Sequence, residues 1–113
     1  MSWSQIAEFE ILRVVAYGAT SASFVALGTP SLYPARILII TNTTDGDMIV
    51  TNDGVNDKMI IPKNSVRLLD LTTNKGGPDG IWSLRQGTQI SVRRASTPTL
   101  GSVYCEFVYG LGD

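Results

Sequence analysis

The sequence contains no histidine and a single cysteine, Cys105, and these two scarcities exclude much of protein chemistry. Without histidine the chain lacks the commonest general base, the commonest metal ligand and the usual switch near neutral pH. A single cysteine cannot close a disulfide within the chain or build a cysteine cage for zinc. We therefore expect a protein that is not an enzyme and that requires no cofactor and no metal.

Charge is scarce as well. Only 17% of the residues are charged, and 9 Lys and Arg against 10 Asp and Glu give a net charge of -1. That balance excludes the basic footprint with which nucleic-acid-binding proteins usually hold phosphates. Apolar runs such as Ile37–Ile40 are far shorter than the roughly 20 residues that span a bilayer, and the first residues do not resemble a signal peptide. We expect synthesis in a cytoplasm and neither nucleic acid nor membrane as a partner.

The residues that are abundant favour β-structure. Val, Ile and Thr suit a pleated surface, and 11 Gly and 5 Pro interrupt the chain at short intervals. Short apolar segments between such turns predict one antiparallel β-sandwich domain of jelly-roll type, over 9–113, with eight or nine strands. A short helix over Ser4–Leu12 is the one helical alternative. The expected strands are Phe9–Tyr17, Ser23–Leu27, Arg36–Asn42, Met48–Thr51, Lys58–Ile61, Val66–Leu71, Ile81–Arg85, Thr88–Arg94 and Val103–Tyr109.

Alternation along these segments predicts which side chains form the core. The last strand is the clearest case, because every second residue from Val103 is apolar while Glu106 falls on the other face. Cys105 belongs to the apolar set, so we expect a buried and chemically quiet thiol. The predicted core consists of Ile37, Ile39, Leu69, Leu71, Val103, Cys105 and Phe107.

Four carboxylates lie close together in the sequence at expected turns. Asp45, Asp47, Asp53 and Asp57 fall within thirteen positions, beside several Asn residues. Carboxylate and amide oxygens are calcium ligands, so these four residues are candidates for a calcium site. Their spacing does not match a known calcium loop, and Asp and Asn also stabilise turns by bonding to backbone N–H groups. The turn interpretation is the one that the pattern favours.

The N-terminal segment carries two large apolar residues ahead of the first expected strand. Trp3 and Ile6 lie within Met1–Glu8, and chain ends are ordered only where something holds them. Oligomers often bury such arms against a neighbouring subunit. We therefore expect Met1–Glu8 to be an arm that packs on another subunit or on a larger assembly, with Trp3 and Ile6 as interface residues.

The middle and the end of the chain resemble small proteins of tailed bacteriophages and prophages. The resemblance covers about residues 35–109 and consists of an order of short β elements and turns. The residues that carry it are Ile37–Asp45, Met48–Asp57, Ile61-Pro62, Leu69-Asp70-Leu71, Gly87–Arg93 and Gly101–Tyr104. It implies a virion structural protein with a β-sandwich fold and no active site.

Two functions of different classes follow from these observations. The first is a non-enzymatic accessory protein of the virion, forming a homo-oligomer on the capsid, as decoration or cement, or at the neck or tail, where it would anchor fibres. Its partners would be copies of itself and the major capsid, neck or tail proteins. The alternative is a β-sandwich module that binds carbohydrate or a receptor through the Asp- and Asn-rich loop tips.

Overall fold

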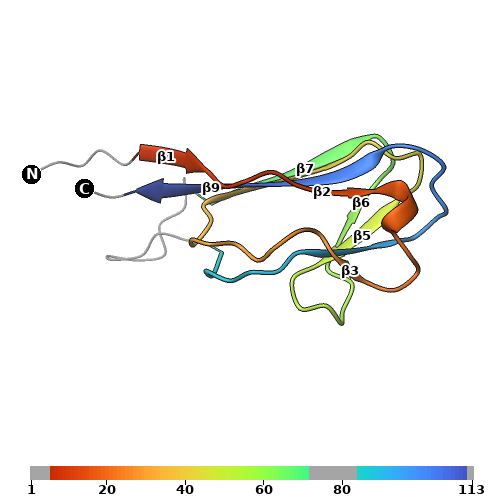
Figure 1. Cartoon of the computed structure of the whole chain (residues 1–113), viewed down its shortest axis with the longest axis horizontal. Coiled ribbons are helices and arrows are strands. Elements are labelled where there is room, and N and C mark those ends of the chain that lie inside the picture. The colour runs from red at the N-terminus through yellow and green to blue at the C-terminus, as the bar shows by residue number, and fades with distance from the viewer. Residues whose placement is uncertain (1–5, 72–83, 112–113) are drawn as a thin grey trace, which may run out of the picture.

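The computed structural model describes residues 6–71 and 84–111, and this part of the chain is built of strands joined by turns. A single turn of 3-10 helix, Tyr17–Ala19, is the one helical element among the described residues. The strands lie in two layers (Figure 1). Their bounds are β1 Ile6–Phe9, β2 Arg13–Ala16, β3 Val25–Ala26, β4 Ile37–Asn42, β5 Met48–Thr51, β6 Met59–Ile61, β7 Ser65–Asp70, β8 Ser91–Arg94 and β9 Ser102–Leu111.

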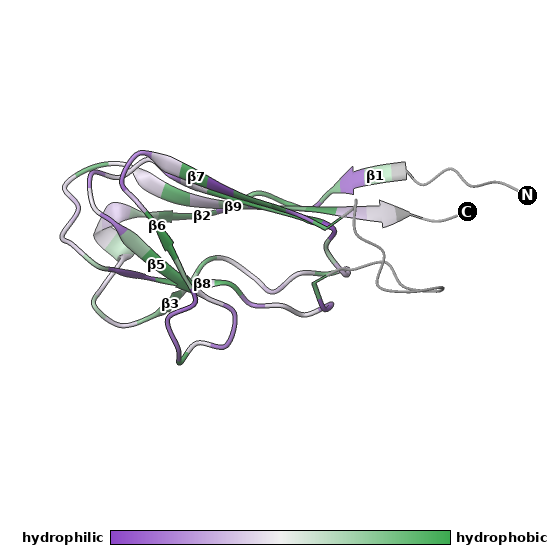
Figure 2. Ribbon diagram, turned by 180° about the vertical axis from the view of Figure 1, so that it is seen from behind, coloured by the Kyte–Doolittle hydropathy of each residue, from purple (hydrophilic) through white to green (hydrophobic). Residues whose placement is uncertain are grey.

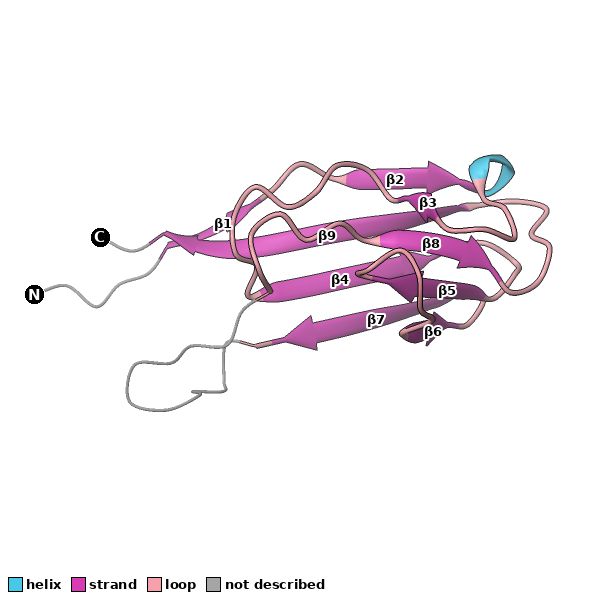
Figure 3. Cartoon of the chain, turned by 90° about the horizontal axis from the view of Figure 1, so that it is seen from below, coloured by secondary structure: helices cyan, strands magenta, loops and turns pink. Residues whose placement is uncertain are grey.

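The two layers are antiparallel sheets with jelly-roll connectivity. The larger sheet has the order β1-β9-β4-β7, with β2 also pairing with β9, and the smaller has the order β3-β8-β5-β6. If β2 to β9 are counted as strands one to eight, these orders read 1-8-3-6 and 2-7-4-5, which is the strand arrangement of a jelly roll. Figure 3 shows β2 and β7 at opposite margins of the larger sheet. The predicted fold is confirmed.

The core lies between the sheets, and β9 shows why the chain folds in this way. Val103, Cys105 and Phe107 are at most 1% exposed, whereas the residues between them face outward. This alternation is the period of a strand with one buried face, and it confirms these three predicted core residues. Hydrophobic residues also lie along β5 and β6 (Figure 2). The other fully buried apolar residues include Leu27, Ile40, Met48, Val50, Ile61 and Val92.

Four of the predicted core residues are not in the core. Ile37 and Ile39 are half-buried on the outward side of β4, and Leu38 and Ile40 occupy the core instead. Leu38 pairs with Phe107 and Ile40 with Cys105, and residues paired across antiparallel strands share a face.

The other two residues belong to the margin of the larger sheet. Leu69 is 37% exposed, and Leu71 is half-buried just beyond the end of β7. Because β7 is an edge strand, its inward face is less completely covered than the inward faces of β4 and β9. The predictions that Leu69 and Leu71 belong to the core are therefore wrong.

The expected first strand, Phe9–Tyr17, is two strands separated by an irregular step. Phe9 pairs with Val108 and Arg13 pairs with Cys105, so residues 10–12 face only residues 106 and 107 of β9. One extra residue on one strand is a β-bulge. The alternative helix over Ser4–Leu12 is wrong, because β1 occupies Ile6–Phe9. The last three residues of the expected arm therefore pair with β9 of their own chain.

The turns between the later strands also differ from the pattern that the sequence suggests, because the chain crosses between the two layers. The Asp45-Gly46 pair is a typical hairpin turn sequence, but β4 and β5, which it joins, belong to different sheets. Gly46 is needed there for space, because a Cβ at that position would lie 2.7 Å from the Ser96 carbonyl oxygen. The turn after β5 does close a hairpin with β6, and Gly54 has a φ of 74°. The expected strand Ile81–Arg85 lies largely outside the described residues, although Leu84 forms a bridge with Ala35.

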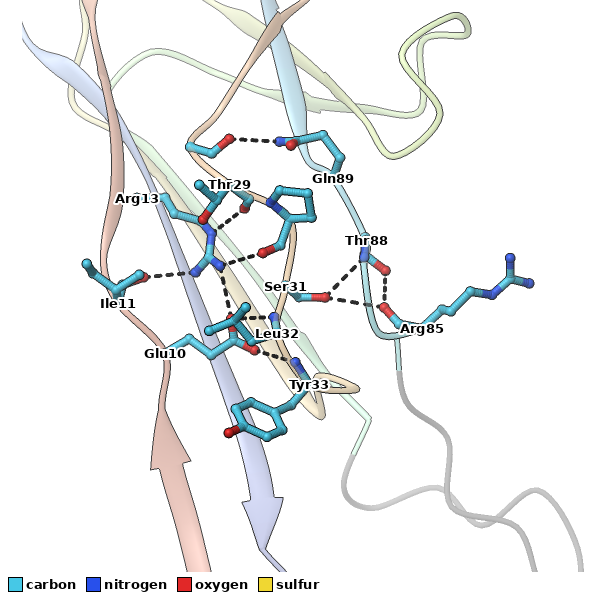
Figure 4. Close-up of polar contacts among 12 residues, drawn as sticks. Glu10, Ile11, Arg13, Thr29, Ser31, Leu32, Tyr33, Arg85, Thr88 and Gln89 are labelled. Carbon is cyan, nitrogen blue, oxygen red and sulfur yellow. Dashed lines mark hydrogen bonds and ion pairs between the residues drawn. The ribbon is translucent and has the colours of Figure 1, made fainter.

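A buried arginine joins the bulge to the loop that leads from β3 to β4. Arg13 is only 3% exposed, and its guanidinium donates four hydrogen bonds (Figure 4). Nε donates to the Thr29 carbonyl oxygen at 2.5 Å, and Nη1 donates to that of Ile11 at 2.9 Å. Nη2 donates to Glu10 Oε1 at 3.0 Å and to the Pro30 carbonyl oxygen at 2.8 Å. A buried charge that is paired and bonded in this way is tolerated in a core.

The partner carboxylate completes the connection. Glu10 accepts hydrogen bonds from the backbone N–H groups of Leu32 and Tyr33, at 3.0 and 3.1 Å. The Arg13 guanidinium also lies 4.8 Å from the centre of the Phe107 ring, a cation–π contact. The Glu10–Arg13 pair therefore ties the β3–β4 loop to the larger sheet and covers one end of the core.

We predict that Gly28→Ala destabilises the fold more than Gly54→Ala does. Both glycines have φ values near +73°, which cost an alanine about 1 kcal/mol or more. A Cβ at Gly28 would lie 2.5 Å from Arg13 Cγ, whereas nothing lies within 4 Å of the equivalent atom at Gly54. Overpacking should add about 1–3 kcal/mol at Gly28 alone. Urea denaturation of both variants measures the difference, and equal losses would show that the Arg13 contact is not tight.

Candidate functional site

The four candidate calcium ligands lie in turns, and each carboxylate already accepts hydrogen bonds. Asp53 is the most heavily engaged, because its Oδ1 accepts from Thr51 Oγ1 and from the backbone N–H groups of Val55 and Asn56 at 2.6–2.9 Å. Asn56 Nδ2 donates to Oδ2 at 3.0 Å. These bonds, led by that from Thr51, hold the pKa of the Asp53 carboxyl well below its usual range.

The other three carboxylates have separate partners. The Asp45 carboxylate accepts hydrogen bonds from the backbone N–H and the hydroxyl of Thr99. The bond from the hydroxyl is the main cause of the lowered pKa of Asp45. Asp47 accepts a bond from the Lys63 N–H at 3.0 Å. Asp57 forms a two-pronged ion pair with Arg93, at 3.0 and 2.6 Å, and the Arg93 hydrogen bonds are the main cause of its lowered pKa.

These contacts give the acidic residues a structural role. Asp53 closes its own turn, and Asp45, Asp47 and Asp57 each fasten a turn to another segment. Among the described residues, no three Asp, Glu or Cys side chains are gathered in a way that could hold a metal ion. The structure therefore does not bring Asp45, Asp47, Asp53 and Asp57 together as one ligand set, and it supports the turn interpretation.

The structure shows where Cys105 lies but describes only one of the two expected interface residues. Cys105 is fully buried, as predicted, and burial raises the pKa of its thiol to about 12, which leaves it protonated at neutral pH. Ile6 belongs to β1, where its backbone pairs with Leu111 of the same chain. Trp3 lies outside the described residues. The described ranges contain no helix that is long and apolar enough to cross a bilayer.

The feature that sequence reasoning missed is the outward face of the larger sheet, which we call the outer face. Strand register arranges its residues in rows, because residues paired across strands share a face. Its two outer rows run Val14–Tyr104–Thr41–Val66 and Phe9–Val108–Ile37–Asp70. The middle row holds Glu106, Ile39 and Leu68, and Leu12 of the bulge lies beside it.

This outer face is more apolar than a solvated sheet face usually is. Phe9 is 79% exposed and Leu68 is 62% exposed, and Leu12, Val14 and Val66 are at least half exposed. Solvated faces of antiparallel sheets normally alternate to polar residues, and a large exposed apolar patch marks an interaction surface. The available signal in the sequence was the pairs of apolar residues at alternate positions, Ile37 and Ile39 in β4 and Val66 and Leu68 in β7.

A shallow hollow lies in the outer face beside the bulge. Its volume is about 390 Å³, and the apolar side chains at its margin come from β4, β9, the end of β1 and the bulge. The lining residues are Phe9, Glu10, Leu12, Ile39, Glu106, Phe107 and Val108. The missing pairing at the bulge explains the hollow, because the extra residue carries the chain away from the regular sheet surface.

Comparison with known proteins places the fold but not a family. No family model matches the sequence, and no curated protein does. A chain in the structure of the cyanophage Pam1 capsid asymmetric unit is similar in structure, with a TM-score of 0.55 and 12% identity, over 99% of this chain and 89% of that chain. A chain from disulfide-linked pili of Bacillus endospore appendages has a TM-score of 0.46 and 9% identity, over 96% and 92% of the two chains.

We predict that calcium does not stabilise the protein. Each of the four carboxylates already accepts at least one hydrogen bond from the protein, and calcium binding to the native state alone would raise the melting temperature. Thermal denaturation in millimolar calcium and in excess chelator should therefore give the same midpoint. A higher midpoint in calcium would contradict this prediction and would support Asp45, Asp47, Asp53 and Asp57 as calcium ligands.

We predict that Asp53→Asn destabilises the fold at neutral pH and by a smaller amount in acid. The pKa of Asp53 is lower in the folded state, so its stabilising bonds are fully present above the unfolded value near 4. This stabilisation declines as the pH falls below the unfolded value, and it is lost only below the lower folded pKa, where the native carboxyl is protonated. Melting temperatures at pH 7 and pH 3 measure this, and Thr51→Val, which removes the main donor, should show the same trend. A deficit of equal size at both pH values would contradict the assignment.

Proposed function

We propose that this chain is a non-enzymatic structural protein of a bacteriophage particle. In this role it is an accessory protein that forms a homo-oligomer on the capsid, as decoration or cement, or at the neck or tail, as an anchor for fibres. The observation that carries the proposal is the similarity to a chain of the cyanophage Pam1 capsid asymmetric unit over nearly the whole of both chains. At 12% identity the likeness concerns the fold, and the function is our inference from it.

Two features of the described residues support a structural role. The polar side chains at the loop tips are used to fasten turns, as Asp53 and the Asp57–Arg93 pair illustrate. The only thiol is buried and protonated at neutral pH. What the surface does offer is a broad apolar sheet face, which suits contact with another protein rather than the binding of a small polar molecule.

The alternative, a module that binds carbohydrate or a receptor, would use the loop tips. Such a module needs carboxylate and amide groups that are available to a ligand, together with aromatic side chains beside them. The four acidic residues of these turns instead accept bonds from their own chain. This arrangement favours the structural role over the alternative.

Quantitative mass spectrometry of purified virions tests the proposal. We expect the chain in particles of the phage or induced prophage that encodes it, in a fixed copy number. Hundreds of copies per particle would assign it to the capsid surface, and dozens or fewer to the neck or tail. Its absence from particles that contain all the other structural proteins would overturn the proposal.

A further inference from the structure

The outer face of the larger sheet has the size of a protein interface. Its exposed apolar residues are Phe9, Leu12, Val14, Val66 and Leu68, and the half-buried residues between them are Ile37, Ile39, Tyr104 and Val108. Their accessible surface is on the order of 700 Å², close to the roughly 800 Å² that each partner contributes to a standard interface. An exposed apolar surface of this extent marks a site of contact with another molecule.

The regular rows of the outer face indicate what covers it. Side chains that stand in a grid on a pleated sheet pack best against a second sheet, at a spacing of about 10 Å. A second copy of this chain presents such a sheet face at equal concentration, and paired copies use the same surface on both partners. The remaining question is whether this face is complementary to itself.

The two sides of the outer face are complementary in shape. On the β7 side, Leu68 protrudes with 62% of its surface exposed. On the β1 and β2 side, at the same level along the strands, the hollow of about 390 Å³ lies beside Leu12 and extends across β9 to Ile39 of β4. Leu68 and most of the lining of the hollow therefore lie on opposite sides of the line between β4 and β9, as the strand order in Figure 3 shows, and Ile39 is the one lining residue that belongs to β4.

A two-fold axis parallel to the strands, passing over the line between β4 and β9, uses this complementarity. Rotation about that axis keeps the rows in place and exchanges the two sides of the sheet. Leu68 of each copy then faces Leu12 and the hollow of the other copy. We propose that the outer face is the interface between two copies of this chain, related by this axis, with each Leu68 seated in the partner's hollow.

The same axis determines the position of the charged residue at the centre of the face. Glu106 is exposed and sits beside Ile39 in the middle row. In the proposed pair, Glu106 faces Ile39 of the other copy, and the two Glu106 side chains are offset sideways by one strand spacing, about 4.8 Å. Each carboxylate still loses water on association, so Glu106 weakens the pairing.

This inference rests on the proposed function in one respect: it identifies the surface through which the expected homo-oligomer would form. Sedimentation equilibrium of the full chain tests it. We expect the wild type to dimerise, Leu68→Asp to weaken dimerisation by roughly tenfold or more, and Glu106→Gln to strengthen it several-fold. Ile60→Asp is the matched control, because Ile60 is 46% exposed and faces outward on the smaller sheet, and it should leave the dimer unchanged. Circular dichroism confirms that each variant is folded.

Cysteine cross-linking tests the arrangement itself. In the double variant Leu12→Cys with Leu68→Cys, mild oxidation should give a disulfide-linked dimer, while either single variant should remain uncrosslinked. The native Cys105 is buried and should not interfere. Cross-linking through Leu68→Cys alone would mean that the two β7 edges meet, and would overturn the proposed axis.

The remaining outcomes separate this inference from the proposed function. A wild type that stays monomeric at high concentration, or a dimer that Ile60→Asp weakens as much as Leu68→Asp does, would overturn the interface. If the chain is found in virions in either case, the proposed function stands without it. A dimer with the expected variant behaviour, in a chain absent from virions, would keep the interface and overturn the function.

Discussion

The last strand, β9, is the element on which the larger sheet depends. Its ten residues pair with β1 and β2 along one side and with β4 along the other. Because its side chains alternate strictly, Val103, Cys105 and Phe107 enter the core while Tyr104, Glu106 and Val108 form the middle of the outer face. The register of the neighbouring strands then assigns each of their residues to one face or the other.

The bulge between β1 and β2 has consequences on both sides of the sheet. On the inward side it places Glu10 and Arg13 together, and their pair holds the backbone of the β3–β4 loop and covers the Phe107 ring. On the outward side it opens the hollow beside Leu12. One inserted residue thus fastens a loop to the core and shapes the surface that we propose as an interface.

The weakly charged composition is reflected in how the acidic residues are used. Asp45, Asp47, Asp53 and Asp57, four of the ten acidic residues, each accept bonds that fix a turn or join two segments, and none of them lies on the outer face. The outer face consequently carries only Glu106 and Asp70 among twelve positions, and this low charge is what makes it suitable for contact with another protein.

The sequence by itself determined the features that local chemistry dictates. Glycine, proline and Asx turns separate β-branched segments, which is enough for an all-β sandwich, and the alternation of β9 identifies Val103, Cys105 and Phe107 as core.

Tertiary structure decided the rest. In β4 four consecutive apolar residues give no polarity signal, so only pairing with β9 shows that Leu38 and Ile40, rather than Ile37 and Ile39, face inward. The Asp45-Gly46 turn carries a hairpin signature, yet it crosses between sheets, because local turn chemistry does not specify which strand the chain joins next. The outer face is likewise a product of tertiary structure: β4 and β7 each carry apolar residues at alternate positions, but the rows come from five strands whose side chains become neighbours only through long-range pairing.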